Sequence, residues 1–474
     1  MAPAFSADPD AAPYASAARA VRAWWRSLTP AQLFVGSFVL LVALGTVGFR
    51  VLPGLYTGAP LHWLDAFFTA TSAICVTGLI VVDTATYFTT WGQAYILLLI
   101  QLGGLGIIGF TSVILVALGR KLSVRQETIA GGVASVVEDI DYRSLTAAVF
   151  RFTLLTELVG AALLYAFWVP DLGWNGAAWP SLFHSISAFC NAGFSTFSTS
   201  LMGFQDNLPL LLVVMAIIVV GSLGFLTLEE LTIWRRVRQK RGRFRLSVHS
   251  QIVVATTAVL LVVGWAAFTA FEWHHTLAGL PLSERIVNGL FASVTTRTAG
   301  FNTIDYGAAT PGTNFLTVVF MTIGGSPGST AGGLKTTTIA LLGLLAWSRV
   351  RGAPTTSVSG RTLPEDTLQQ AMSLLIVGVG LMIAGVFVFS ILEVPDAPGA
   401  FPFLAYMFEA VSAFNTVGLS TGVTGDLSPG GRLLTILLMF IGRVGPLTLV
   451  AAMSRTPKRM TGGFRYAHED VSIG

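Results

Sequence analysis

Charged residues are scarce in this chain of 474 amino acids. Lys, Arg, Asp and Glu together make up 11% of the sequence, the hydrophobic types make up 53%, and the mean hydropathy is +0.72. A soluble domain typically carries about 25% charged residues, so the composition excludes a chain whose whole surface faces water. It predicts an integral membrane protein.

Cysteine is also scarce, because Cys75 and Cys190 are the only two in the sequence. Two cysteines provide neither a disulfide framework nor a convincing metal cluster. No phosphate-binding motif stands beside a plausible strand, so we expect the chain to bind no nucleotide or other cofactor itself. The polar, Ala-rich segment 1–30 lacks the pattern of a cleaved signal peptide, and we interpret it as a cytoplasmic N-terminal lead.

Long hydrophobic runs alternate with shorter, semi-polar stretches. A helical span needs about 20 apolar residues, and eight runs are long enough: 31–49, 91–118, 146–169, 208–233, 248–271, 314–347, 367–392 and 432–454. Four stretches rich in Ser, Thr and Gly lie between them, at 61–78, 180–193, 282–300 and 402–418. They are too short to cross alone and fit re-entrant segments, whose backbone must be covered by protein or water. The prediction is an all-α membrane protein with eight transmembrane spans and four re-entrant half-helices.

The basic residues predict the orientation. Of the 28 Lys and Arg residues, 21 lie in the N-terminal lead, in the connectors after the second, fourth and sixth spans, and in the tail 455–474. In an eight-span protein all these segments lie on one side, which the excess of positive charge identifies as the cytoplasm. We therefore expect both termini in the cytoplasm and the half-helices entering from outside. The connector 235–245 holds seven basic residues and could bind anionic lipid or a cytosolic partner, or serve only as a topology signal.

A unit of span, half-helix, glycine turn and span occurs four times. The units are residues 31–118, 146–233, 248–347 and 367–454. Their turn glycines are Gly78, Gly193, Gly300 and Gly418, spaced by 115, 107 and 118 residues. Close packing of small residues between helices does not explain four copies in matching register. The repeats predict a pseudo-symmetric arrangement of four helix–pore-loop–helix units around a central pore.

Other positions recur at fixed distances from these glycines. Ten residues before them stand Phe68, Phe183, Leu290 and Phe408. Six residues before them stand Ser72, Ser187, Val294 and Ser412. His184 and Glu409 share the position nine residues before the glycine, and we expect them to make buried polar contacts rather than to bind an ion.

The turns have the chemistry of a site for a monovalent cation. Backbone carbonyls arranged around an axis can replace the water shell of an ion, and glycine permits both the dihedral angles and the close approach that this needs. The C-terminal ends of the half-helices carry partial negative charge, which favours a cation. The four turns contain no Asp or Glu, which argues against a divalent ion. The predicted ion ligands are Val76, Thr77, Gly78, Asn191, Ala192, Gly193, Thr298, Ala299, Gly300, Thr416, Val417 and Gly418.

These turns resemble the filter loops of the Trk/Ktr/HKT superfamily of potassium transporters. The stretches 296–303, 324–336 and 441–446 resemble the superfamily as well, and the tail 468–474 is similar to the bacterial KtrB type. The resemblance covers about residues 31–474. It implies a potassium uptake protein of a bacterial inner membrane, not an enzyme, with K⁺ held only at the filter and Na⁺ as an optional activator.

The resemblance also implies partners. The chain would form a homodimer in which each protomer has its own pore, and a cytoplasmic ring of nucleotide-binding RCK subunits would gate it. Any nucleotide would bind to that ring. No nucleic-acid partner is expected.

A gate is predicted below the filter. The stretch 324–336 interrupts the sixth span with Gly, Ser and Thr, which excludes a regular lipid-facing helix, and in the superfamily this position is an intramembrane loop that blocks the pore. An unpaired Arg443 inside the eighth span is costly, and the resemblance places it below the filter, bonded to carbonyls of the loop. A simple helix kink and an arginine paired elsewhere are the alternatives. The predicted gate residues are Gly324, Gly325, Ser326, Gly328, Ser329, Gly332, Gly333, Lys335 and Arg443.

Two other functions stay open from the sequence. A secondary cation symporter with alternating access often contains inverted repeats, whereas the four repeats here share one orientation. A channel-like subunit of a potassium-pumping ATPase would need a partner ATPase. Glycine in all four turns favours potassium over sodium by resemblance, and the sequence does not determine coupling to Na⁺ or H⁺.

Overall fold

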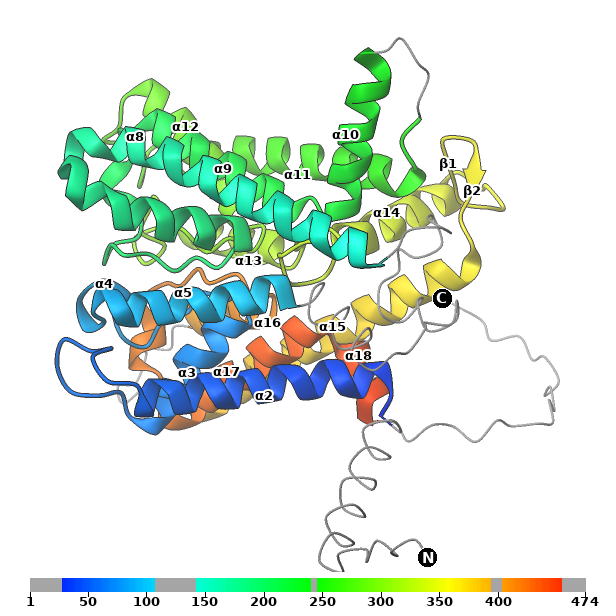
Figure 1. Cartoon of the computed structure of the whole chain (residues 1–474). Coiled ribbons are helices and arrows are strands. Elements are labelled where there is room, and N and C mark those ends of the chain that lie inside the picture. Colours follow the sequence, from blue (N-terminus) through cyan, green and yellow to red (C-terminus); the bar gives the residue numbers. More distant parts are fainter. Residues whose placement is uncertain (1–27, 107–141, 240–244, 394–402, 454–474) are drawn as a thin grey trace, which may run out of the picture.

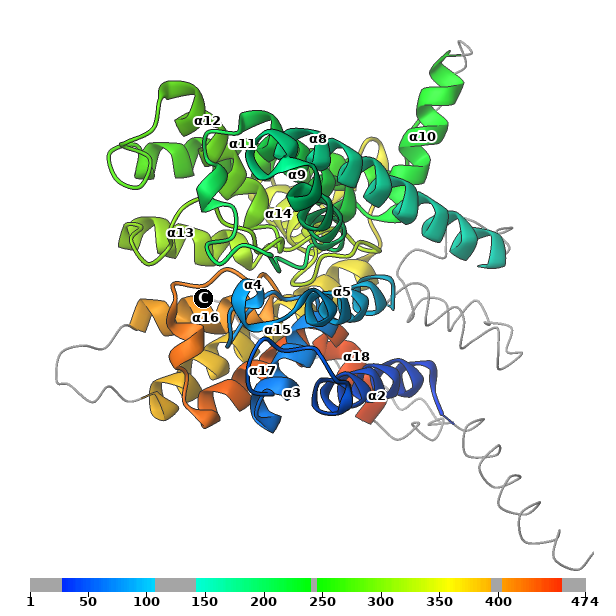
Figure 2. The same cartoon turned by 60° about the vertical axis from the view of Figure 1, so that its left-hand side comes forward.

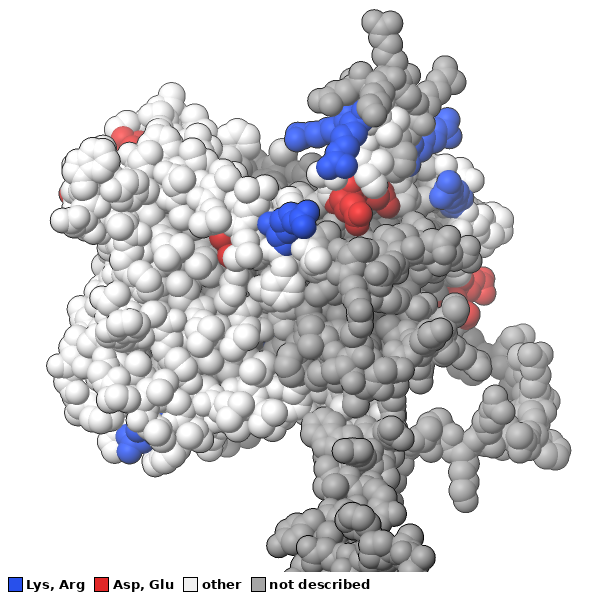
Figure 3. Space-filling model, viewed as in Figure 1, with Lys and Arg blue, Asp and Glu red and all other residues white. Residues whose placement is uncertain are grey.

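The computed structural model describes residues 28–106, 142–239, 245–393 and 403–453, which are mostly α-helical (Figure 1). Four helices in this part of the chain are long and apolar enough to cross a membrane alone, and two bent helix pairs raise the number to six. Figure 3 shows few charged side chains among the described residues of one face, and most of the Lys and Arg seen there lie near one end. These features are those of a helical membrane protein. The count of eight spans stays a prediction.

The first unit contains three main helices, α2 (Pro30–Val51), α3 (Trp63–Ile74) and α5 (Thr90–Leu105), with a single turn, α4 (Thr84–Tyr87), before α5. The start of α2 is determined locally, because the Thr29 side chain accepts a bond from the Gln32 N–H and the Gln32 side chain accepts one from the Thr29 N–H. The end of the second expected span, 107–118, lies outside the described residues.

The second unit is bent in two places. The helix α8 (Tyr142–Cys190) contains both the third expected span and the second half-helix, and its chain turns at Gly173, which has a φ of +73°. After the single turn η3 (Met202–Phe204), α9 (Leu208–Ser222) is followed by α10 (Phe225–Gln239) at an angle of 105°. The expected span 208–233 is therefore not one continuous helix, because Gly224, at a φ of +84°, breaks it.

The third unit consists of α11 (Val248–Glu272), α12 (Leu282–Thr295), α13 (Pro311–Met321) and α14 (Thr336–Val350). The predicted loop 324–336 lies in the interruption between α13 and α14, except for Thr336, which is the first residue of α14. A small hairpin of β1 (Ser357–Val358) and β2 (Arg361–Thr362) follows α14.

The fourth unit consists of α15 (Glu365–Leu392), α16 (Phe403–Phe414), the single turn η4 (Val423–Asp426), α17 (Pro429–Val444) and α18 (Pro446–Met453). α17 and α18 meet at 90° around Gly445, which has a φ of +87°. The expected eighth span, 432–454, is thus not one straight helix.

The four units form a closed circle. α5 packs against α8, α9 against α12, α13 against α16, and α17 against α3. Figures 1 and 2 show the first and fourth units together on one side of the molecule and the second and third on the other. The first and last units of the chain are therefore neighbours in space.

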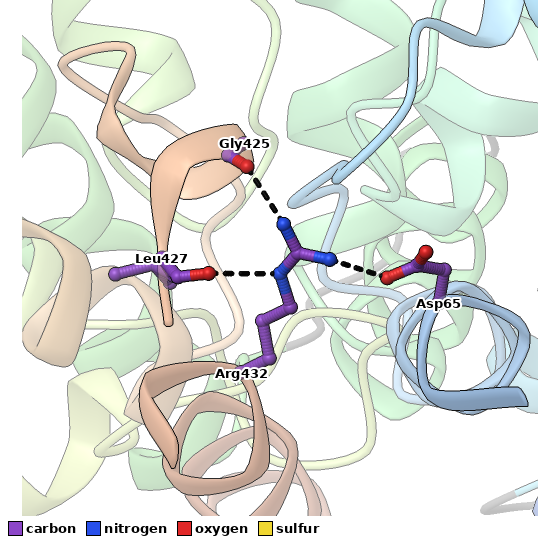
Figure 4. A network of polar contacts seen from close by, with 4 residues as sticks. All are labelled: Asp65, Gly425, Leu427 and Arg432. Atoms are coloured by element: carbon purple, nitrogen blue, oxygen red, sulfur yellow. Dashed lines mark hydrogen bonds and ion pairs between the residues drawn. The ribbon is translucent and has the colours of Figure 1, made fainter. Parts of the chain in front are cut away.

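An ion pair joins the first and last units (Figure 4). The Arg432 Nη1 atom lies 2.6 Å from Asp65 Oδ1, which links α17 to the first turn of α3. The same guanidinium donates to the carbonyls of Leu427, at 3.0 Å, and Gly425, at 2.9 Å. Arg432 therefore stabilises both the contact between units and the loop before α17.

The first full helix after the glycine turn of each unit, α5, α9, α13 or α17, starts in the same way. A polar N-cap side chain accepts a bond from the third backbone N–H of the helix and also contacts the end of the first helix of the unit or the chain that follows it. The four pairs are Thr89 with the Gly54 carbonyl, Asn207 with Asp171, Thr310 with Glu272, and Ser428 with Glu393. The partner group differs between the units, but in each unit the N-cap residue links this helix to the end of the first helix or to the chain just after it.

Candidate ion pathway

The four glycine turns share an unusual backbone conformation. In each turn two residues have a positive φ, namely the glycine and the residue two positions before it. None of these four preceding residues is itself a glycine, and three of them are β-branched. Such residues rarely adopt this conformation, and it persists only where the surrounding structure determines it, typically at functional sites. The φ values are 56° and 95° for Val76 and Gly78, 58° and 69° for Asn191 and Gly193, 67° and 83° for Thr298 and Gly300, and 51° and 89° for Thr416 and Gly418.

A buried hydroxyl in each half-helix holds its turn. Ser72 donates to the carbonyl of Leu79 at 2.7 Å and accepts from the N–H of Gly78 at 3.1 Å. Ser187 and Ser412 donate to the equivalent carbonyls at 2.8 and 2.6 Å. The serine six residues before the glycine, which the sequence showed as a repeat, therefore bridges the turn from one side to the other.

The third turn follows a shorter register than the sequence pattern suggested. Its bridging hydroxyl belongs to Thr295, which donates to the Phe301 carbonyl at 2.5 Å, and not to the position of Val294. The Ala299 N–H bonds to the carbonyl four residues back, whereas the other turns span five. Phe291 is fully buried in place of Leu290. Counting a fixed number of residues back from the glycine did not identify Thr295 and Phe291. Their side-chain types, hydroxyl and aromatic, nevertheless match those of the other three repeats.

The four turns meet one another in a closed ring. A Cβ atom added to Gly78 would lie 2.3 Å from the Ala192 carbonyl oxygen, and one added to Gly418 would lie 2.0 Å from the Thr77 carbonyl oxygen. A Cβ on Gly193 would lie 2.8 Å from the Gly300 Cα, and one on Gly300 would lie 2.6 Å from the Val417 carbonyl oxygen. Each turn thus touches the next, and the fourth touches the first. Only glycine permits this approach.

The ring is rich in buried oxygen. The hydroxyl groups of Thr77, Thr298 and Thr416 are buried and have no hydrogen-bond partner within the described part of the chain. Buried polar groups are normally paired, so a group of unpaired oxygens beside a ring of backbone carbonyls suits an ion.

Arg297 is a residue whose importance the sequence patterns did not indicate. It precedes the third turn, at the place occupied by Cys75, Cys190 and Asn415 in the others, and only 2% of it is exposed. Its Nη2 donates to the Thr257 hydroxyl of α11 at 3.3 Å, while Nε and Nη1 have no partner among the described residues. A buried cation beside the ring makes the third unit electrostatically different from the other three.

The loop between α13 and α14, residues 322–335, lies directly against the ring. It contains the predicted gate loop 324–336 except for Thr336, which begins α14. A Cβ atom on Gly332 would lie 1.9 Å from the Thr416 hydroxyl, and one on Gly333 would lie 3.0 Å from Asn415 Oδ1. The loop also folds on itself, because the Gly324 N–H bonds to the Leu334 carbonyl at 2.8 Å and Ser329 donates to the Ser326 carbonyl at 2.6 Å. It is a compact structure against one side of the ring.

Arg443 fixes this loop to the surrounding helices. Its Nη1 donates to the Thr330 carbonyl at 2.6 Å, and its Nη2 donates to the Gly103 carbonyl of α5 at 3.1 Å. The side chain is buried. Thr330 in turn donates to the Phe189 carbonyl at 2.9 Å, beside the second turn. The expected bond from Arg443 to a carbonyl of the loop is therefore present, and the second bond of Arg443 reaches α5 instead.

The loop also borders a cavity. Lys335 donates from Nζ to the Ala331 carbonyl at 2.7 Å, within the loop itself. A cavity of about 260 Å³ is lined by Ser329, Gly333 and Lys335 of the loop, by Arg443, and by residues at the start of α2 and in α18. Two cationic side chains, those of Lys335 and Arg443, thus line the cavity beside the loop.

His184 and Glu409 make the buried polar contacts expected of them. The His184 Nε2 atom lies 2.9 Å from the Ser195 hydroxyl, and Glu409 accepts from Ser420 and, at 2.9 Å, from Thr424. Each partner serine stands eleven residues later, in the chain that leaves the turn. In the second and fourth units, the side chain at this position therefore links the half-helix to the chain that follows the turn.

Comparison with known proteins identifies the family. Residues 34–461 match the family described as "TrkH: Cation transport protein". The chain belongs to this family of cation transport proteins. Family members are membrane proteins that move ions, which agrees with the apolar helices and the ring of turns.

Similar proteins of the family come from several bacteria. The chain is 35% identical to the "Potassium/sodium uptake protein NtpJ" of Enterococcus hirae over 95% of its own length and 98% of that protein. It is 34% identical to the "Ktr system potassium uptake protein B" of Bacillus subtilis over the same shares, and 36% identical to the protein of that name from Vibrio alginolyticus over 86% of this chain and 88% of that one.

A solved structure shares the fold. The potassium transporter TrkH from Vibrio parahaemolyticus superposes with a TM-score of 0.71, at 20% identity, over 89% of this chain and 84% of that one. The arrangement of helices around the ring is thus a fold of this family.

Proposed function

We propose that this chain carries potassium ions into the cell through the centre of the ring of turns. The observation that carries the proposal is the closed contact of the four turns, each through a glycine that admits no side chain. Carbonyl oxygens brought together around one axis can replace the water shell of K⁺. The names of the relatives from B. subtilis and V. alginolyticus, which describe potassium uptake proteins, support the same ion.

The ligands would be backbone oxygens of the twelve turn residues predicted from the sequence. Threonine hydroxyls without a partner in the described segments would add to them at three positions. No carboxylate belongs to the turns, which suits a monovalent ion that binds loosely enough to leave again.

We infer a topology of eight spans and four half-helices that enter from outside. In this topology α13 and α14 together form one interrupted span. α9 and α17 each cross the membrane, and their bent continuations, α10 and α18, turn away from the direction of the span. The excess of Lys and Arg on one side supports termini in the cytoplasm of a bacterial inner membrane.

The loop 322–335 is proposed to close the path on the cytoplasmic side of the ring. Its contacts with Thr416 and its bond to Arg443 support this role. Opening would require the loop to leave the ring. We further propose that the chain works as a homodimer and that a cytosolic ring of RCK subunits, which would bind the nucleotide, moves the loop.

Growth at low external potassium tests the function. A strain that lacks its own potassium uptake systems should grow when it expresses this chain with its regulatory subunit, and reconstituted protein should take up Rb⁺ faster than Na⁺. Uptake of Na⁺ alone, or failure to transport either ion, would contradict the proposal.

A glycine variant tests the assigned ring. Gly300→Ser places a side chain 2.6 Å from the Val417 carbonyl oxygen at a residue with a φ of +83°, so we expect the preference for Rb⁺ over Na⁺ to fall by about tenfold or more, the equivalent of about 1.4 kcal/mol. Gly58→Ala, at a glycine with no atom near its added Cβ, is the control and should leave selectivity unchanged.

A further inference from the structure

The helix α10 leaves the bundle sideways. It meets α9 at 105°, so it runs across the direction of the long helices, and both views show it projecting beyond them (Figures 1 and 2). If the long helices cross the membrane, α10 lies parallel to the membrane plane. α10 follows the end of α9, and the basic connector 235–245 begins within α10. In the topology proposed above, this end of α9 is the cytoplasmic end.

The projecting part of α10 is positively charged. Arg235 and Arg236 are both exposed, and Figure 3 shows basic side chains gathered on this helix and acidic ones near its base. Of the two acidic residues, Glu230 accepts a bond from the Ser247 N–H at 3.0 Å, which ties the base of α10 to the start of α11, and Glu229 is exposed. The basic segment continues in the sequence to Arg245.

The base of α10 is also joined to the intramembrane loop. The Phe225 N–H donates to the Gly328 carbonyl at 3.2 Å, and the Ser326 N–H donates to the Ser222 carbonyl at 3.0 Å. A Cβ on Gly224 would lie 2.5 Å from the Pro327 carbonyl oxygen. The hinge between α9 and α10 thus contacts the loop on three consecutive loop residues, 326–328. A change in the direction of α10 must disturb these contacts.

We propose that Arg235 and Arg236 bind the phosphate groups of anionic phospholipids in the cytoplasmic leaflet, and that this binding holds the loop against the ring. The guanidinium group matches phosphate in geometry and charge, and a basic helix parallel to the membrane surface is attracted to anionic lipid. A cytosolic protein is the other candidate occupant. The direction of α10, along the membrane rather than out of it, favours the lipid.

This inference rests on the proposed function and topology, and vesicles without any cytosolic protein test it. We would measure Rb⁺ uptake by the purified full chain in phosphatidylcholine vesicles with and without phosphatidylglycerol. Because bound lipid keeps the loop in place, phosphatidylglycerol should lower the basal uptake several-fold, and high salt should reverse this by screening. The double variant Arg235→Gln, Arg236→Gln should show the higher uptake in both kinds of vesicle.

A matched control removes two other arginines expected on the same side of the membrane. The double variant Arg349→Gln, Arg361→Gln takes away the same charge, at the end of α14 and in β2, far from the hinge in sequence, and should keep the response to phosphatidylglycerol. An equal loss of response in both double variants would reduce the effect to general surface charge and overturn the proposal. So would an effect of the α10 arginines that appears only after the cytosolic subunit is added, since the surface would then bind protein.

A dye gives a readout independent of transport. Cys75 and Cys190 are buried, so a cysteine introduced at the exposed Thr232 can be labelled selectively with a polarity-sensitive fluorophore. Its emission should shift when phosphatidylglycerol is added, and not in the Arg235→Gln, Arg236→Gln background. Absence of this shift contradicts lipid binding. Absence of Rb⁺ uptake in every vesicle, with the shift present, would instead contradict the proposed function.

Discussion

Replacement of Arg443 by alanine removes the two bonds through which this side chain links the intramembrane loop to α5. One bond, of 2.6 Å, reaches the Thr330 carbonyl in the loop, and the other, of 3.1 Å, reaches the Gly103 carbonyl in α5. The loop also keeps contacts that do not involve Arg443, such as the bond from Thr330 to the Phe189 carbonyl. The variant therefore weakens the position of the loop without removing every support.

The size of the effect follows from two opposing terms. A hydrogen bond to a charged group contributes about 1.5–3 kcal/mol, so the loss of two bonds costs several kcal/mol. Arg443 is buried, and its Nε has no partner within the described ranges, so alanine also relieves the cost of burying a poorly compensated charge. We expect a net shift of about 2 kcal/mol toward the displaced loop, which corresponds to about thirtyfold in population.

The assay is the initial rate of Rb⁺ uptake into vesicles that hold the chain without any cytosolic subunit. Arg443→Ala should raise this rate by up to about thirtyfold. Arg443→Lys keeps the charge but replaces the guanidinium fork with a single ammonium, so it should give an intermediate rate. A rate for Arg443→Ala equal to that of the unmodified chain, with equal amounts of folded protein, would refute the reasoning. A rate for Arg443→Lys equal to that of the unmodified chain would show that charge alone, rather than hydrogen bonding, blocks the path.

Three further predictions concern the ring and its supports. Gly418→Ala should abolish Rb⁺ uptake, because its Cβ would lie 2.0 Å from a carbonyl oxygen of the first turn, while Gly58→Ala, in open space, should transport normally. Thr295→Ala should reduce the preference for Rb⁺ over Na⁺ and destabilise the protein by about 1–3 kcal/mol, since a buried carbonyl loses its partner; Thr296→Ala, whose hydroxyl bonds within its own helix at 2.9 Å, should change selectivity less. Arg432→Gln should lower the stability of the detergent-solubilised protein by about 1 kcal/mol, because its ion pair is only partly exposed to solvent.

Uptake assays, ion competition and thermal unfolding measure these outcomes. Normal uptake by Gly418→Ala would contradict the contact between the first and fourth turns. Equal effects of the two threonine variants would contradict the shorter register of the third turn. An unchanged unfolding temperature for Arg432→Gln would mean that the ion pair between the first and last units contributes nothing measurable.

Several features of the fold follow from local sequence and could be predicted without coordinates. Hydrophobic runs and the scarcity of charge indicate helices in a membrane. Proline and a polar N-cap mark where α17 begins, after Ser428. The four glycine turns are visible as a repeat because each copy needs the same backbone conformation, and a positive φ beside a neighbouring chain restricts the residue type to glycine at Gly78 and Gly418.

Other features depend on packing between distant segments. The runs 208–233 and 432–454 read as continuous spans, because hydropathy does not register the change of direction that Gly224 and Gly445 permit. A fixed spacing from the glycine did not identify Thr295, because the bridging hydroxyl of the third turn lies one residue nearer the glycine than in the other turns. Only the bond to the Phe301 carbonyl shows which hydroxyl bridges the third turn.

By itself the sequence determined that four similar turns exist, that each needs glycine, and that an arginine stands in an apolar helix. Only the tertiary structure decided that the turns touch in a closed ring, that the first and fourth units are neighbours, and that the arginine bonds to the loop. The physical reason is range. Backbone conformation and burial leave a local pattern in residue type, whereas the partner of Arg443 lies 113 residues away at one nitrogen and 340 at the other, and is a backbone carbonyl that any residue could supply.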